Sequence, residues 1–91
     1  MRNTRAMPWT PEALTTRVFE ILRDDLLSVG PEFTRRSNLV DAGLDSLAVT
    51  QLLLAIEEST GVWIDESLLT EETLASAETL ADCVHARLAA A

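Results

Sequence analysis

Residues 41–59 read DAGLDSLAVTQLLLAIEES, and this stretch decides the fold. At about 100° per residue, an α-helix that begins at Ser46 gathers an apolar stripe along one side. The stripe consists of Val49, Leu52, Leu53 and Ile56. Gly61 follows it, and glycine suits the left-handed conformation with which many helices end. The sequence therefore predicts a helix over residues 46–59 that packs this stripe against a core.

The same helix carries a second apolar face. Leu47 and Leu54 lie almost opposite the stripe, surrounded by polar and acidic residues, namely Thr50, Gln51, Glu57 and Glu58. Burying these charges without partners is costly, so we expect this face to point outward. For Leu47, a position beneath the preceding loop is an equal alternative. For Leu54, contact with a partner protein is favoured over an isolated surface leucine.

Working outward from this helix, the flanking segments are also helical. Thr10 and Pro11 form a typical helix start, and the apolar spacing after them predicts a helix over residues 11–28. A short helix over residues 71–75 and a last helix capped by Ser76 complete the pattern. The prediction is an all-α bundle of three main helices and one short helix. Residues 1–9 are interpreted as a flexible leader and residues 10–91 as a single domain.

A long connection separates the first two main helices. Residues 30–45 exceed the usual length of a helix–helix loop, and such loops are often held in place by buried side chains. The expected anchors are Phe33, Leu39, Val40 and Leu44.

The composition excludes several classes of protein. The chain has 91 residues and a net charge of −8, which fits one small, monomeric domain and argues against a nucleic-acid partner. No apolar run approaches the ~20 residues of a membrane span, and no secretory signal is recognisable, so a cytoplasmic protein is expected. Cys83, the single cysteine, forms no internal disulfide, and with His85 it makes no zinc framework. Residues 37–91 hold ten acids and only Arg87, which indicates either solvated faces or a docking surface for a cationic partner.

Ser46 stands at the start of the decisive helix, where two roles are open. From local physics alone, its hydroxyl is a natural N-cap. Alternatively the hydroxyl carries a phosphate, because a helix N-terminus offers free N–H groups and a positive dipole end. Gly43 permits the tight turn before it. A serine hydrolase is the weakest hypothesis, since His85 reaches Ser46 only through folding.

The string from Asp41 to Leu47, at the head of a helix that ends in Ala55-Ile56-Glu57-Glu58, resembles the acyl carrier protein family. The resemblance extends from about Thr10 to Leu88. It implies that Ser46 receives 4′-phosphopantetheine from coenzyme A through a Mg²⁺-dependent phosphopantetheinyl transferase, and that the arm's thiol holds cargo as a thioester. It also implies that Asp45 helps the transferase to dock and to orient its metal, that partners recognise the outer face of the helix, and that the chain is a non-catalytic carrier without a metal of its own.

Departures from the family pattern bear on the cargo. Carriers of fatty-acid synthesis usually have acids early in this helix, where Ala48 and Gln51 stand here. This favours a stand-alone carrier of polyketide or nonribosomal-peptide biosynthesis, loaded by an acyl- or aminoacyl-loading enzyme and visited by downstream synthase or tailoring enzymes. The alternatives are a fatty-acid-type carrier and a non-covalent interaction module in which Ser46 only caps the helix. Trp63, unusual in its position, either shields the bundle or adds a contact point.

Overall fold

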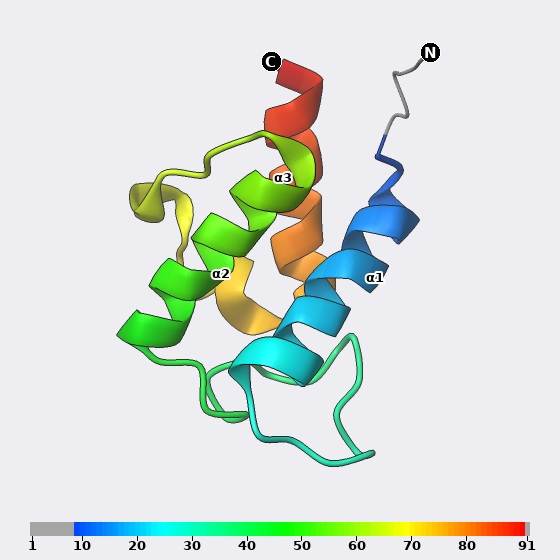
Figure 1. Cartoon of the computed structure of the whole chain (residues 1–91), viewed down its shortest axis with the longest axis vertical. Coiled ribbons are helices and arrows are strands. Elements are labelled where there is room, and N and C mark those ends of the chain that lie inside the picture. Colours follow the sequence, from blue (N-terminus) through cyan, green and yellow to red (C-terminus); the bar gives the residue numbers. More distant parts are fainter. Residues whose placement is uncertain (1–8, 91) are drawn as a thin grey trace.

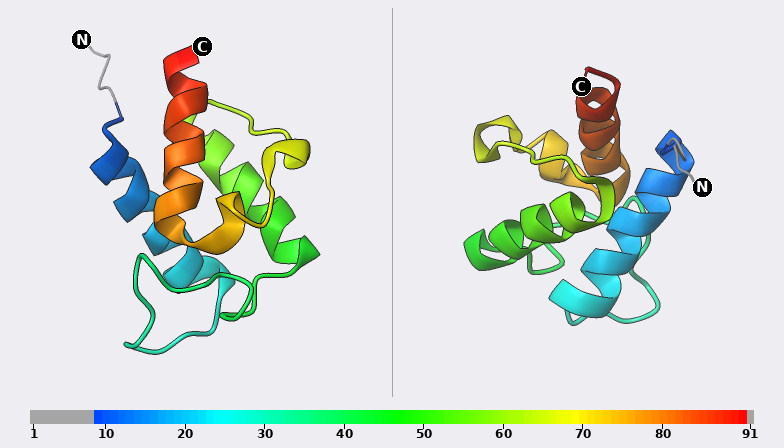
Figure 2. Two further views of the ribbon diagram at one scale, coloured as in Figure 1. Left: turned by 180° about the vertical axis from the view of Figure 1, so that it is seen from behind. Right: turned by 45° about the horizontal axis from the view of Figure 1, so that its top comes forward.

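The computed structural model describes residues 9–90, and the regular structure of this part of the chain is entirely helical (Figure 1). The elements are α1 (Pro11–Glu20), η1 (Ile21–Leu26), α2 (Ser46–Thr60), η2 (Glu66–Leu68), η3 (Thr73–Ala75) and α3 (Ala77–Ala90). α2 and α3 run in the same direction, and α1 runs against both (Figures 1 and 2). The predicted all-α bundle is confirmed. The expected leader lies, except for Trp9, outside the described residues.

The first helix begins as predicted but ends earlier. The Thr10 Oγ1 atom caps it by accepting the Ala13 N–H at 3.0 Å. Its last part, η1, is a π-helical stretch, and the Leu27 N–H closes it by donating to the Leu22 carbonyl at 2.8 Å. Leu27 itself is extended, with φ −113° and ψ 150°. The predicted end at residue 28 is wrong because the chain leaves the helix at Leu27, whose side chain turns into the core.

The core lies between the three long helices. Its members from α2 are Val49, Leu52, Leu53 and Ile56, as predicted, together with Ala48. Those from α3 are Ala77, Leu80, Ala81 and Val84, and Leu88 packs against them partly buried. Cys83, at the flank of this face, is half-buried, and burial raises the pKa of its thiol. None of the described helices is both long and apolar enough to cross a membrane.

Three of the four expected anchors hold the long loop. Phe33, Leu39 and Leu44 are buried, and the Phe33 ring stacks on Phe19 with centroids 5.3 Å apart. Val40 is 61% exposed, so its prediction as an anchor is wrong. The loop turns back between Leu39 and Leu44, whose N–H donates to the Leu39 carbonyl at 2.9 Å. This turn directs both leucines inward and Val40 outward.

The chain between α2 and α3 makes two 3₁₀ turns where the sequence predicts one short helix over residues 71–75. The second turn, η3, occupies only Thr73–Ala75, and Thr70 Oγ1 accepts the Thr73 N–H at 3.2 Å before it. The first turn, η2, was not expected. Ser76 caps α3 as predicted: its Oγ accepts the Thr79 N–H at 3.2 Å, while Thr79 Oγ1 accepts the Ser76 N–H at 3.0 Å.

Candidate functional site

The site begins with the residue that caps α2, and this residue is Asp45 rather than Ser46. Asp45 is extended, with φ −120° and ψ −177°, and its Oδ1 accepts the Ala48 N–H at 2.9 Å. The prediction of Ser46 as the N-cap is therefore wrong. The helix thus begins one residue earlier than it would with Ser46 as its cap, and the Asp45 carboxylate reaches the first-turn amides. The negative charge of this carboxylate also suits the positive end of the helix dipole.

Ser46 is consequently the first helical residue of α2, and its side chain is exposed. The Ser46 carbonyl accepts a hydrogen bond from the Thr50 hydroxyl at 3.2 Å, so the backbone of Ser46 is held within the helix. The capping role that competes for its Oγ is taken by Asp45. A module in which Ser46 serves only as a helix cap is thus contradicted by the structure.

A tight turn precedes Asp45 and Ser46. Gly43 has a φ of +109°, a conformation that residues with a Cβ atom rarely adopt. The turn is fixed on its other side by Asn38, whose Oδ1 accepts the Asp41 N–H at 2.8 Å and whose carbonyl accepts the Ala42 N–H at 3.0 Å. With Leu44 buried directly before Asp45, the turn sets where α2 starts.

The second apolar face of α2 points outward, as the sequence predicts. Leu47 is 67% exposed and Leu54 is 53% exposed, so Leu47 does not lie beneath the loop. The residues around them are also exposed: Thr50, Gln51, Glu57 and Glu58. We call these six residues the outer face. The structure brings them together on one side of α2, which begins at Ser46.

Two exposed apolar side chains outside α2 were not anticipated. Val40 lies on the turn before α2, and Leu68 is 44% exposed in η2. Neither could be read from spacing, because each has an apolar neighbour that is more buried, Leu39 and Leu69 respectively. The signal available in the sequence was only that each stands close to acids.

A small helical bundle that presents a serine hydroxyl at the first turn of α2, beside an outward apolar face, has the form of a carrier domain. The phosphopantetheine attachment site family matches residues 16–84, and the chain belongs to this family. Similar proteins include the acyl carrier protein MbtL of Mycobacterium sp., 42% identical over 78% of this chain and 75% of that protein. The acyl carrier protein MbtL of Mycobacterium tuberculosis is 40% identical over 79% of this chain and 88% of that protein.

Solved structures agree with this assignment. The chain is similar to one in the crystal structure of an engineered Bradyrhizobium japonicum glycine:[carrier protein] ligase complexed with carrier protein from Agrobacterium tumefaciens and ATP. The TM-score is 0.63 at 30% identity, covering 78% of this chain and 95% of that one. A second match, with a TM-score of 0.55 at 30% identity, is to a chain in the structure of the Bradyrhizobium japonicum ligase complexed with glycylated carrier protein, covering 77% and 92%.

The chain is therefore a carrier protein, and its cofactor is covalently attached 4′-phosphopantetheine. The residues at the start of α2 fit this group. An exposed hydroxyl stands where the first amides of a helix point outward, which is a favourable place for a phosphate.

Proposed function

We propose that Ser46 carries the 4′-phosphopantetheine group and that the protein presents acyl or aminoacyl groups to partner enzymes on this arm, with residues 10–91 acting as one carrier domain. The observation that supports this most directly is that Asp45, and not Ser46, caps α2. The exposed Ser46 hydroxyl is therefore not needed as a helix cap. When bound, the arm supplies a terminal thiol that holds cargo as a thioester.

In the attachment reaction, this chain supplies the nucleophile, the solvent-exposed hydroxyl of Ser46. A bond forms between Ser46 Oγ and the phosphorus next to pantetheine in coenzyme A, and the bond from that phosphorus to the bridging oxygen breaks. The nucleotide leaves, and the hydroxyl proton passes to a base of the transferase. The helix dipole and the first-turn N–H groups that Asp45 does not occupy would favour the negative phosphodiester at this position.

Intact mass after incubation with coenzyme A and a promiscuous phosphopantetheinyl transferase tests the assignment. We expect the wild-type protein to gain one phosphopantetheinyl group and Ser46→Ala to gain none. Ser28→Ala, at another exposed serine, is the matched control and should be modified like the wild type. Because Ser46 is not the cap, its alanine variant should unfold within about 0.5 kcal/mol of the wild type. A folded wild-type protein that stays unmodified would refute the proposal.

Asp45 has two separable roles under this proposal, capping α2 and helping the transferase dock and orient its metal. Asp45→Ala should lower the free energy of unfolding by about 1 kcal/mol through loss of the cap. Asp45→Asn keeps a good capping side chain and removes the charge, so it should keep most of the stability while slowing modification of Ser46. Urea unfolding and the initial rate of mass increase measure the two effects. If Asp45→Asn is modified as fast as the wild type, the charge plays no part in docking.

We assign partner recognition to the outer face. Its two leucines supply exposed apolar contact, and its threonine, glutamine and glutamates surround them as a polar rim. This is the usual organisation of a protein interface, with an apolar centre and a polar edge. The expected partners are the transferase, an acyl- or aminoacyl-loading enzyme, and downstream synthase or tailoring enzymes, with the carrier itself a monomer.

We further propose that the chain is non-catalytic and acts in the cytoplasm, where coenzyme A and its partner enzymes are found. His85 is the ninth residue of α3, which places it about 12 Å along that helix from its start. Ser46 is the first residue of α2, which runs in the same direction as α3 (Figure 1), and this supports a chain in which Ser46 and His85 do not act as a nucleophile and its base.

The proposed pathway class is polyketide or nonribosomal-peptide biosynthesis, with an aminoacyl group as the favoured cargo. Two observations support it. Ala48 and Gln51 replace the early acids of α2 that are usual in fatty-acid carriers. One of the similar structures is a ligase complex with a glycylated carrier protein. Incubating the phosphopantetheinylated protein with amino-acid ligases and ATP, or with acyl-transfer enzymes and acyl-coenzyme A, identifies the cargo class by mass.

A further inference from the structure

The long loop between η1 and α2 encloses a recess with a volume of about 290 Å³. Its apolar lining residues are buried or half-buried and its polar ones are mostly exposed, so the recess has an apolar base and a polar edge. The base is formed by Val29, Phe33 and Ala42, and the edge includes Glu32, Asn38 and Asp41. None of the described residues that line it is basic or belongs to the outer face. The recess is therefore separate from the surface that we assign to partner recognition.

The recess is held in shape by contacts on two of its sides. The Phe33 ring stacks on Phe19 with an angle of 8° between the ring planes, and the Arg23 guanidinium lies 5.1 Å from the centroid of the Phe19 ring. On the other side, Asn38 fixes the turn that carries Asp41, through the bond from the Asp41 N–H to Asn38 Oδ1. A site formed in advance loses little conformational entropy when a ligand enters it.

The charge of the recess comes from two carboxylates. Glu32 is oriented by the backbone, since its Oε2 accepts the Gly30 N–H at 2.9 Å. A Cβ atom at Gly30 would lie 2.6 Å from Glu32 Oε1, so the glycine permits this close approach. The ion pairs among the described residues involve neither Glu32 nor Asp41. Both acids are exposed, and the recess therefore favours a small ligand that combines a cationic group with an apolar one.

The recess lies within reach of a group tethered to Ser46. The long loop and the start of α2 are at the same end of the bundle (Figures 1 and 2). Asp41 precedes Ser46 by five residues, which span at most about 18 Å even when fully extended. The turn between them shortens this path, because the Gly43 N–H donates to the Val40 carbonyl at 3.0 Å. A flexible arm on Ser46 thus has only a short distance to bridge.

We propose that this recess holds the aminoacyl end of the cargo, with the cargo's α-ammonium group at Glu32 and Asp41 and its side chain against Phe33. The inference rests on the proposed attachment at Ser46. A free α-amino group has a pKa of about 7.7–8.0, so it is largely cationic in neutral water. The volume lies just below the range of about 300–1,000 Å³ that is usual for small-molecule sites. The recess therefore selects small neutral aminoacyl groups and disfavours acyl groups that carry a carboxylate.

A comparison of glycyl and acetyl cargo tests the recess directly. The two groups differ only in that an ammonium replaces one hydrogen, and the transferase can attach either one from the corresponding synthetic acyl-coenzyme A. Amide NMR spectra of each loaded protein are compared with those of the protein that carries the arm alone. We expect glycyl cargo at mildly acidic pH to shift the amide signals of Phe33, Asp41 and Ala42, and acetyl cargo to leave them in place.

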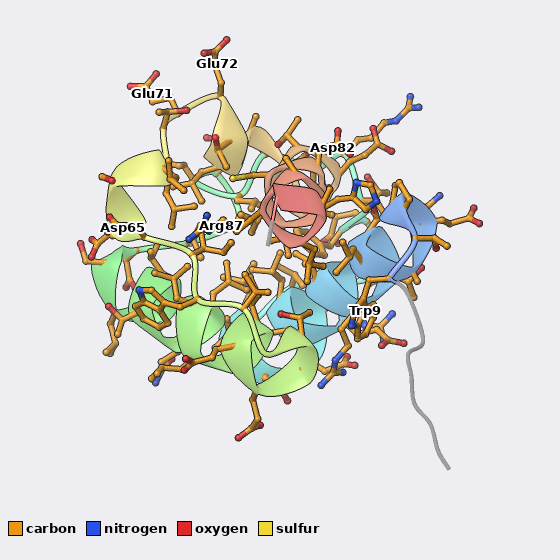
Figure 3. All side chains as sticks on the ribbon, turned by 90° about the horizontal axis from the view of Figure 1, so that it is seen from above. Trp9, Asp65, Glu71, Glu72, Asp82 and Arg87 are labelled. Atoms are coloured by element: carbon orange, nitrogen blue, oxygen red, sulfur yellow. The ribbon has the colours of Figure 1, made fainter. Side chains whose placement is uncertain are left out.

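The acidity of the glycyl ammonium group measures what the two carboxylates contribute. Because a nearby carboxylate stabilises the charged form, the acid dissociation constant should be about threefold lower in the wild type than in combined Glu32→Gln and Asp41→Asn, as an exposed ion pair implies. Combined Glu72→Gln and Asp82→Asn removes the same charge at exposed positions before η3 and on α3, and should titrate like the wild type (Figure 3). Gly30→Ala changes no charge but crowds Glu32 Oε1, and should give an intermediate value.

The outcomes separate this inference from the attachment itself. Complete loading by intact mass without glycyl-specific amide shifts would overturn the recess as a cargo site and leave the attachment at Ser46 standing. Equal dissociation constants in the two double variants would do the same. If Ser46 accepts no group at all, the attachment is refuted and the recess proposal falls with it.

Discussion

Leu39→Ala will lower the free energy of unfolding by about 3 kcal/mol, the cost of removing a leucine side chain from a closed core. Leu39 is fully buried, and its backbone joins two parts of the site: its N–H donates to the Ala75 carbonyl at 3.3 Å, and its carbonyl accepts the Leu44 N–H at 2.9 Å. The residue therefore holds the turn before α2 against η3. Urea denaturation followed by circular dichroism measures the change.

Val40→Ala is the control for this prediction. The two residues are neighbours, but Val40 is 61% exposed, so its truncation should change stability by no more than about 0.5 kcal/mol. If the two variants have similar unfolding midpoints, the loop is not anchored through Leu39. A Leu39→Ala protein that remains folded at low temperature should also be modified more slowly at Ser46, because the turn that sets the start of α2 has lost its support.

Leu54→Asp will reduce the kcat/KM of the transferase by about tenfold or more, because it places a charge in the apolar centre of the outer face, where truncating an anchor already costs 1–2 kcal/mol or more. The thermal midpoint should hardly move, since Leu54 is 53% exposed. The rate of mass increase at varied carrier concentration gives kcat/KM, and circular dichroism gives the midpoint.

Two further variants make this result specific. Thr16→Asp adds the same charge at an exposed position on α1 and should leave kcat/KM unchanged. Leu54→Met keeps the apolar contact and should retain most of the activity. A large drop in the thermal midpoint of Leu54→Asp would show that the leucine supports the fold, and an unchanged kcat/KM would remove it from the transferase contact.

The sequence predicts the helices and their faces well where one period governs a long segment. Along α2, the 3.6-residue spacing predicts the burial of Leu52 and Ile56 and the exposure of Leu54, and all three are confirmed. The spacing leaves open whether Leu47 lies beneath the loop, and the structure shows that Leu47 is exposed. The helix end at Gly61 is equally local, since its φ of +79° is one that glycine readily adopts.

Predictions from the sequence are wrong where neighbours of similar chemistry compete for one role. Asp45 and Ser46 are both good capping residues, and the buried Leu44 before them decides which one stands at the helix boundary. Leu39 and Val40 are both apolar, and only the hydrogen-bonded turn to Leu44 shows which of them faces the core. In each pair, packing against distant parts of the chain determines which residue takes the role, and composition and spacing do not.

The position of the cap has a consequence for the life cycle of the carrier. Because Asp45 secures the start of α2, the attachment that we propose at Ser46 would leave the capping hydrogen bond of the helix intact. Unmodified and modified chains can then share the same capped start of α2. The proposed attachment would therefore change the surface of the protein at Ser46 and leave its folded core as it is.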